Sequence, residues 1–190
     1  MGNVHVVDKR LFLNEADLHS FMRSLQRLPG DNAVFRVDGR WTIWGICRRV
    51  RELRGTVGIL GLHCHGNASW LQLGPGLSLP AQTANFSVLR GCWVGRYPRI
   101  EIHACAVASA TPIACSAAMA TVESLPSVCT PGTDSPGSPG RALVQAIADN
   151  AGVLTIAAFN AQLIERLGFE GAVVYCRPAT YATAAALIGP

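Results

Sequence analysis

The sequence predicts an α/β fold built on one mostly parallel sheet, and three observations support that prediction. Apolar, β-branched runs alternate along the chain with segments whose apolar residues recur at helical spacing. The run over residues 56–65 is apolar almost throughout, which is typical of a parallel strand that helices bury on both faces. A chain of 190 residues, of which 49% are hydrophobic, is long enough for one domain with its own core.

The N-terminal segments predict a strand, a helix and a second strand. Residues 3–8 alternate and are β-branched, which indicates the first strand. Asn14 is expected to cap a helix that ends at Pro29 and Gly30, and residues 32–39 are expected to form the second strand. The residues of the helix that recur at helical spacing are Leu18, Phe21, Met22, Leu25 and Leu28.

The middle of the chain is expected to contain two more long strands. In order, we expect a helix over 42–53, a strand over 56–65, a short hairpin over 69–79 turned at Gly74, Pro75 and Gly76, a short helix over 84–93, and a strand over 99–109. The hairpin therefore follows the third strand directly. The fourth long strand comes after it, separated by one short helix.

The last third of the chain is expected to complete the sheet. We expect a short helix over 113–122, a flexible loop rich in Pro, Gly and Ser over 123–140, a helix over 140–152, a strand over 153–159, one or two helical turns over 161–169, and a last strand over 171–177. No repeat or domain boundary is evident, so residues 1–190 are expected to form one domain. The prediction is a three-layer α/β/α sandwich around a six-stranded sheet with right-handed crossovers.

The charged residues and the N-terminus argue against nucleic-acid and membrane partners. The net charge is +4, and the densest basic cluster lies on one amphipathic segment: Arg48, Arg49, Arg51 and Arg54. A solvated helix face accounts for such a cluster without a nucleic acid. The first ten residues are too polar for a signal peptide, and no apolar run is long enough to span a membrane.

The seven cysteines form no CxxC pair and their number is odd, so neither a disulfide framework nor a zinc ribbon is indicated. Reduced thiols in a cytoplasmic protein are the expected state. Phosphate-binding glycine motifs and the GxSxG serine elbow are both absent, so no nucleotide cofactor and no serine hydrolase site are expected.

Two candidate functional residues lie at the ends of neighbouring predicted strands. His65 ends the third strand, and Cys105 lies near the end of the fourth. Ligands bind beyond the carboxyl ends of parallel strands, and neighbouring strands are about 4.8 Å apart, so the two side chains are expected to share one site. An imidazole beside a thiol can assist attack on a carbonyl and later protonate the leaving group. Gly66 leaves room for a substrate, and its N–H together with that of Cys105 can donate to an oxyanion.

The runs "ILGLHCHGN", "IEIHACAVAS" and "GRALVQAIADNAGVLTIAAF" resemble the caspase-like cysteine peptidase fold, the clan of caspases, legumain, gingipains, separase and CHAT domains. The similarity covers about residues 4–177 and is closest to bacterial members with a small hairpin after the His-Gly pair. Those families carry His-Gly after the third strand and Cys after the fourth, followed by a helix and a fifth strand. The resemblance implies that His65 and Cys105 form a catalytic dyad and that a peptide or protein is the substrate, with no cofactor.

The resemblance also places an activation loop between the nucleophile and the next helix. We therefore expect residues 129–140 to order over the site on binding. Four possible triggers of activation remain: proteolytic processing, a small activator, dimerisation and an activating partner protein. Asp149 and Glu101 are candidates to orient His65 or to line a specificity pocket.

Two alternatives to the peptidase remain at this point. His63 shares a strand face with His65, and His103 shares one with Cys105, so these four side chains are a candidate mixed His/Cys metal site. The second alternative is a catalytically inactive caspase-like module that binds a protein through the edge of the last strand. Cys64 points to the face opposite His65 and is expected to be a core residue.

Overall fold

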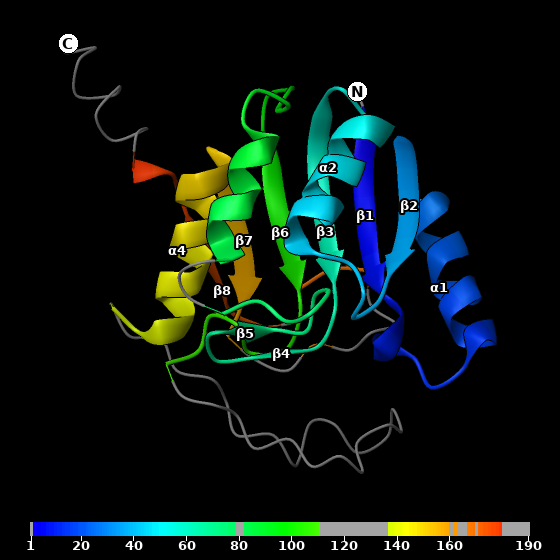
Figure 1. The fold of residues 1–190 in the computed structure, drawn as a ribbon, viewed down its shortest axis with the longest axis horizontal. Helices are drawn as coiled ribbons and strands as arrows, with labels where there is room; N and C mark the ends of the chain where they lie inside the picture. Colours follow the sequence, from blue (N-terminus) through cyan, green and yellow to red (C-terminus); the bar gives the residue numbers. More distant parts are fainter. Residues whose placement is uncertain are drawn as a thin grey trace.

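Six strands form one sheet in the order β2-β1-β3-β6-β7-β8 (Figure 1). The computed structural model describes residues 2–78, 82–110, 137–159, 162, 167–169 and 171–179. The strands are β1 (Gly2–Asp8), β2 (Asp31–Val37), β3 (Val57–His63), β6 (Arg99–His103), β7 (Leu154–Ala158) and β8 (Val173–Cys176). All neighbours pair in parallel except β7 and β8, which are antiparallel. The predicted α/β class with a mostly parallel six-stranded sheet is confirmed.

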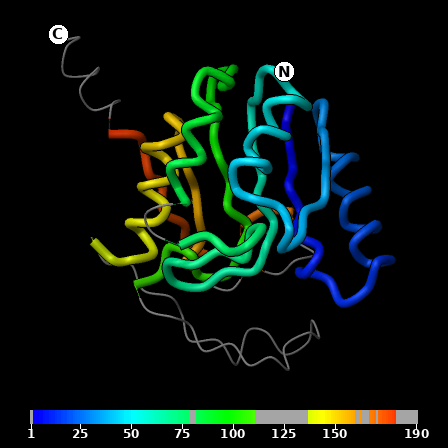
Figure 2. Tube along the Cα trace, viewed as in Figure 1, coloured from blue at the N-terminus to red at the C-terminus, as the bar shows by residue number. Residues whose placement is uncertain are grey.

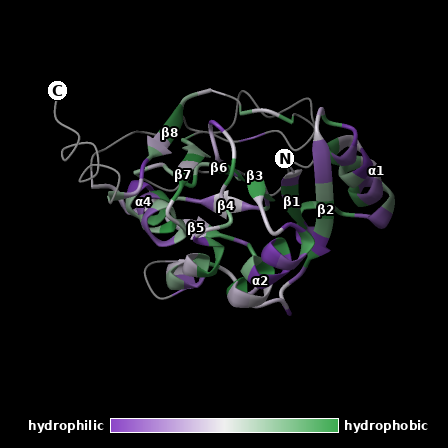
Figure 3. Ribbon diagram, turned by 90° about the horizontal axis from the view of Figure 1, so that it is seen from above, coloured by the Kyte–Doolittle hydropathy of each residue, from purple (hydrophilic) through white to green (hydrophobic). Residues whose placement is uncertain are grey.

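Helices cover both faces of this sheet. Figure 3 shows α1 (Glu15–Gln26) on one face, with α2 (Ile43–Leu53) and α4 (Pro139–Ala151) on the other. The 3-10 helix η2 (Gln82–Leu89) packs between α2 and α4. The main core lies under these three elements, and a smaller apolar cluster lies under α1. The arrangement is compatible with the predicted three-layer sandwich.

The helix boundaries follow from the capping residues. Asn14 accepts a hydrogen bond from the Asp17 N–H at 2.9 Å, so the predicted N-cap of α1 is confirmed. Thr42 caps α2 through the Gly45 N–H, and Ser138 caps α4 through the Arg141 N–H. Each cap satisfies a backbone donor that the first helical turn leaves without an internal partner.

The hairpin after β3 begins earlier than the sequence predicts. Its strands are β4 (Gly66–Asn67) and β5 (Trp70–Leu71), so the hairpin begins directly after His65 and turns at residues 68–69. The predicted turn at residues 74–76 also forms, because the Leu71 and Leu77 backbones exchange hydrogen bonds of 3.0 and 2.9 Å. Figure 2 shows this double turn crossing beneath the carboxyl ends of the strands.

Three expected segments lie wholly or largely outside the described residues: the helix over 113–122, most of the loop over 123–140, and most of the helical turns over 161–169. The expectation that residues 129–140 cover the site falls there as well, apart from the start of α4. Within the described residues, none of the helices combines the length and apolar character needed to cross a membrane.

Candidate active site

His65 stands at the carboxyl edge of the sheet, two residues beyond the end of β3. Its side chain is exposed, and its Nε2 lies 3.2 Å from the carbonyl oxygen of Arg10. A carbonyl oxygen only accepts hydrogen bonds, so Nε2 carries the hydrogen in this contact. In the neutral ring the lone pair is then on Nδ1, the nitrogen that can act as a base.

The Arg10 carbonyl is held in a short 3-10 helix, η1 (Lys9–Leu11), directly after β1. The Asp8 carboxylate begins this helix by accepting the Arg10 N–H at 3.1 Å. Because β1 and β3 are neighbours and parallel, η1 and His65 emerge at the same edge of the sheet. The partner of the histidine is therefore supplied by the adjacent strand end.

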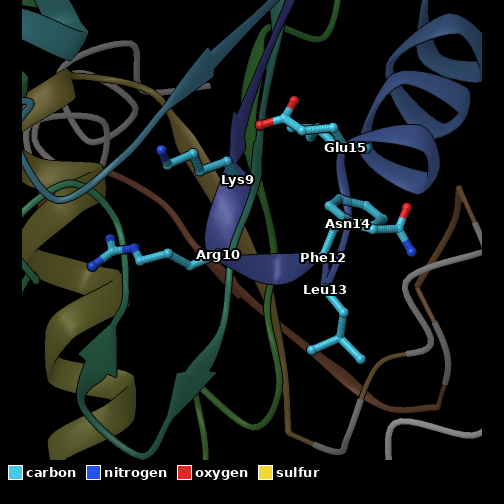
Figure 4. A pocket seen from close by; sticks show the side chains of 7 residues that line it. Lys9, Arg10, Phe12, Leu13, Asn14 and Glu15 are labelled. Carbon is cyan, nitrogen blue, oxygen red and sulfur yellow. The ribbon is translucent and has the colours of Figure 1, made fainter.

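A cavity of about 310 Å³ lies beside η1, between it and the start of α1. Its lining residues are Lys9, Arg10, Phe12, Leu13, Asn14, Glu15 and Leu18. Figure 4 shows the Arg10 side chain extending away from Leu13 and Asn14. The cavity thus adjoins the main chain that holds the His65 ring.

Cys105 lies in a tight turn two residues after β6. The sequence predicts a strand over 99–109, and this is wrong beyond His103, because the chain turns there. Ala106 has φ of 47°, a left-handed conformation that costs an alanine free energy, and its carbonyl accepts the Ser109 N–H at 3.0 Å. A non-glycine residue held in this region is a mark of a locally constrained site. The turn leaves the Cys105 side chain half-buried at the edge of the sheet.

The His-Gly segment and the cysteine turn are in direct contact. The Cys64 N–H donates to the His103 carbonyl at 3.4 Å, which continues the β3–β6 pairing by one residue. A Cβ built on Gly66 would lie 3.2 Å from the Cys105 carbonyl oxygen and 2.5 Å from a methyl of Val107. The sequence-predicted residues His65, Gly66 and Cys105 therefore belong to two chain segments that pack on each other.

Segments on either side of β7 also contact the cysteine turn. The Gln162 N–H lies 3.4 Å from the Cys105 sulfur, and the Gln162 carbonyl oxygen lies 3.8 Å from it. On the other side of the turn, a Cβ on Gly140 would lie 2.3 Å from the Val107 carbonyl oxygen. The first turn of α4 thus packs against the cysteine turn without space for a side chain.

Three other histidines, on β1, β3 and β6, form a different arrangement. His63 Nε2 lies 3.2 Å from His5 Nδ1, and His103 Nε2 lies 3.1 Å from the Glu101 carboxylate. Within the part of the chain that the structure describes, no three His, Cys, Asp or Glu side chains are grouped as metal ligands. The mixed site of His63, His65, His103 and Cys105 is not formed there.

Neither candidate carboxylate orients His65. Glu101 accepts hydrogen bonds from Arg99 and His103, and Asp149 accepts from Gln145 and from the Ala179 N–H. The residue that holds the ring is Arg10, which sequence reasoning missed. A main-chain carbonyl is present at every position, so no residue type signals this role.

The buried cysteines behave as core residues. Cys64 is 1% exposed and packs in the main core, as strand alternation predicts. Burial raises the pKa of the Cys64 thiol, and that of Cys47 to about 12. Thiols held protonated in this way are poor nucleophiles, so neither of these two is suited to covalent catalysis.

Comparison with family models, with curated proteins and with solved structures finds no match to this chain.

Proposed function

We propose that the protein is a caspase-like cysteine peptidase in which His65 and Cys105 form the catalytic dyad. The observation that carries the proposal is the packing of the Gly66 backbone against the Cys105 turn, since it joins the two segments that thiol catalysis requires. A second observation also supports the proposal: the hydrogen bond from His65 Nε2 to the Arg10 carbonyl leaves Nδ1 as the nitrogen that can accept a proton.

The topology supports the same proposal. The His-Gly pair follows the third strand of the large sheet, and the hairpin β4–β5 comes directly after it. Cys105 follows the fourth strand, β6, and the chain then returns through α4 to the fifth strand, β7. This is the order of elements that the resemblance to caspase-like peptidases implies.

The proposed reaction cleaves a peptide bond in two steps. His65 Nδ1 accepts the proton of the Cys105 thiol as the sulfur attacks the carbonyl carbon of the substrate. The N–H groups of Gly66 and Cys105 are proposed to donate to the oxyanion that develops. The C–N bond breaks as His65 returns the proton to the leaving amine, which leaves a thioester. Water, deprotonated by His65, hydrolyses the thioester and the thiol recovers its proton.

Cleavage of a diverse peptide library tests the proposal. Cys105→Ala should abolish turnover, and His65→Ala should lower it by about 10²–10⁴-fold, the usual contribution of a general acid–base group. His19→Ala is the matched control, since that imidazole is exposed on α1. Equal turnover by the wild type and both dyad variants would refute the assignment.

A second candidate is an inactive module of the same fold that binds a partner by sheet pairing. β8 is one of the two edge strands of the described sheet, and its Tyr175 side chain is 61% exposed. Iodoacetamide labelling near neutral pH separates the two candidates. In the peptidase, Cys105 reacts faster than the six other cysteines, whereas an inactive module gives Cys105 no such advantage.

A further inference from the structure

We propose that Arg10 is a positioning residue for His65: its carbonyl holds the imidazole while its guanidinium fixes the hairpin that carries the His65 main chain. The role of this contact in catalysis rests on the proposed function. The contact itself does not, so it can be tested separately.

Three hydrogen bonds close a cycle through Arg10, His65 and Gln72. His65 Nε2 donates to the Arg10 carbonyl at 3.2 Å, and the Gln72 N–H donates to the His65 carbonyl at 2.8 Å. The cycle closes where Arg10 Nη2 donates to the Gln72 carbonyl at 3.2 Å. Arg10 therefore contacts the His65 ring directly through its carbonyl, and it contacts the His65 main chain indirectly, through Gln72.

The guanidinium is itself anchored by Asp8. Arg10 Nε and Nη2 reach the two Asp8 carboxylate oxygens at 2.8 and 2.6 Å, which is a bidentate pair. The Asp8 side chain is fully buried, and the pair raises the pKa of Arg10. Nη2 also lies 2.6 Å from the Gly74 carbonyl oxygen, so its two N–H groups are shared among the Asp8, Gln72 and Gly74 oxygens. One planar group thus joins the end of β1 to two carbonyls of the hairpin.

Only arginine combines these contacts. A lysine ammonium is a single point donor and cannot span both Asp8 oxygens while also reaching the Gln72 and Gly74 carbonyls. Loss of the guanidinium leaves those carbonyls without this donor and releases the hairpin from η1. The His65 main chain then shifts relative to the Arg10 carbonyl, and the ring loses the bond that keeps the hydrogen on Nε2.

The end of β2 provides a matched control. Arg40 pairs with Asp38 at the same two-residue spacing, with Nη2 2.9 Å from the carboxylate. Its side chain is 88% exposed, so this pair is a surface counterpart of the Asp8–Arg10 pair. Arg40→Gln removes the same chemical group from the neighbouring strand end and is expected to leave His65 unchanged.

The experiment follows the His65 ring by NMR in protein labelled with ¹⁵N in its imidazoles, with His65→Ala used for assignment. In the wild type we expect the neutral Nε2–H tautomer to dominate. Arg10→Gln should convert it to a mixture of tautomers, and Arg10→Lys should do the same while keeping a positive charge beside the buried Asp8. Arg10→Lys therefore remains informative if Arg10→Gln does not fold.

Wild-type ring signals in either folded Arg10 variant would overturn the proposal, as would an equal change in Arg40→Gln. The pH profile of Cys105 alkylation is recorded in the same samples, and in both Arg10 variants we expect a several-fold lower rate with a displaced profile. If the wild type cleaves no peptide but the tautomer still changes in the Arg10 variants, the peptidase fails and the positioning contact stands.

Discussion

The imidazole rings of His63 and His103 lie face to face, with centroids 4.6 Å apart and planes within 6°. The two residues occupy paired positions on β3 and β6, so the sheet register stacks one ring on the other. His5 of β1 extends the row, since its Nδ1 lies 3.2 Å from His63 Nε2. Three neighbouring strands thus present a continuous row of imidazoles on the face of the sheet that α1 covers.

Aromatic side chains and one carboxylate enclose this histidine row. Phe21 of α1 meets the His63 ring edge-on, and Phe169 stacks on His103. Glu101 bonds to His103 Nε2 at the end of the row. In this row, His63 lies two residues before His65, and His103 lies two residues before Cys105. Packing of the row therefore fixes the ends of β3 and β6, from which His65 and Cys105 emerge.

Stability is expected to fall as the pH drops below about 6.5. Burial lowers the pKa of His63 well below its usual value, and burial together with the nearby His103 lowers that of His5. Below pH 6.5 the unfolded chain therefore binds protons that the folded chain does not, which lowers the free energy of unfolding by at most about 1.4 kcal/mol per pH unit for each such group. Burial acts to raise the pKa of Glu101, but its hydrogen bonds to His103 and Arg99 outweigh burial and lower this pKa to about 2. Protonation of Glu101 therefore removes further stability between about pH 4.5 and 2.

Urea unfolding between pH 8 and pH 5 measures this dependence. His63→Phe should flatten the profile because it removes one of the titrating groups, and His19→Ala, at an exposed position on α1, should not. A free energy of unfolding that stays constant from pH 8 to pH 5 would show that these histidines bind protons equally in both states.

Gly61 is expected to be required by the histidine row. A Cβ at this position would lie 2.6 Å from His5 Nδ1 and 3.0 Å from His63 Nε2. Gly61→Ala should therefore destabilise the protein by about 1–3 kcal/mol, the usual effect of overpacking, and should separate the two rings. Gly55→Ala is the control, because a Cβ there meets nothing within 4 Å. Equal unfolding midpoints for the two variants would contradict the packing described.

The sequence predicted the elements better than it predicted their ends. Within the described residues, apolar periodicity located the long helices and strands, Asn14 located the start of α1, and strand alternation placed Cys64 in the core, because these signals are local. The end of β6 at His103 depends on a left-handed Ala106, and alanine, unlike glycine, does not signal that conformation. The contact of His5 with His63 joins residues that are 58 positions apart, so only the register of β1 on β3 reveals it.

The packing of Gly66 on the cysteine turn predicts a rescue experiment. The nearest atom to a Cβ on Gly66 is a Val107 methyl at 2.5 Å, followed by the Ala104 Cβ at 3.0 Å. Gly66→Ala should cost about 1–3 kcal/mol of unfolding free energy, and adding Val107→Ala should recover part of it, since the closest clash is then removed. A double-mutant cycle by urea unfolding measures the coupling. Strictly additive effects would mean that the two residues are not in contact.

Gly140 provides the complementary test from the side of α4. Elsewhere in a helix, replacing Gly with Ala stabilises by about 1 kcal/mol. Here the Cβ would lie 2.3 Å from the Val107 carbonyl oxygen and 2.4 Å from that of Ser109, which are main-chain atoms of the cysteine turn. Gly140→Ala should therefore lower the unfolding midpoint and, by displacing the turn, slow alkylation of Cys105.

The helical control is Gly45→Ala in α2, where the nearest atom is the Thr42 side-chain oxygen at 3.1 Å. The sign of the change in stability tests this packing, because a stabilised Gly140→Ala variant would place α4 away from the turn that carries Cys105.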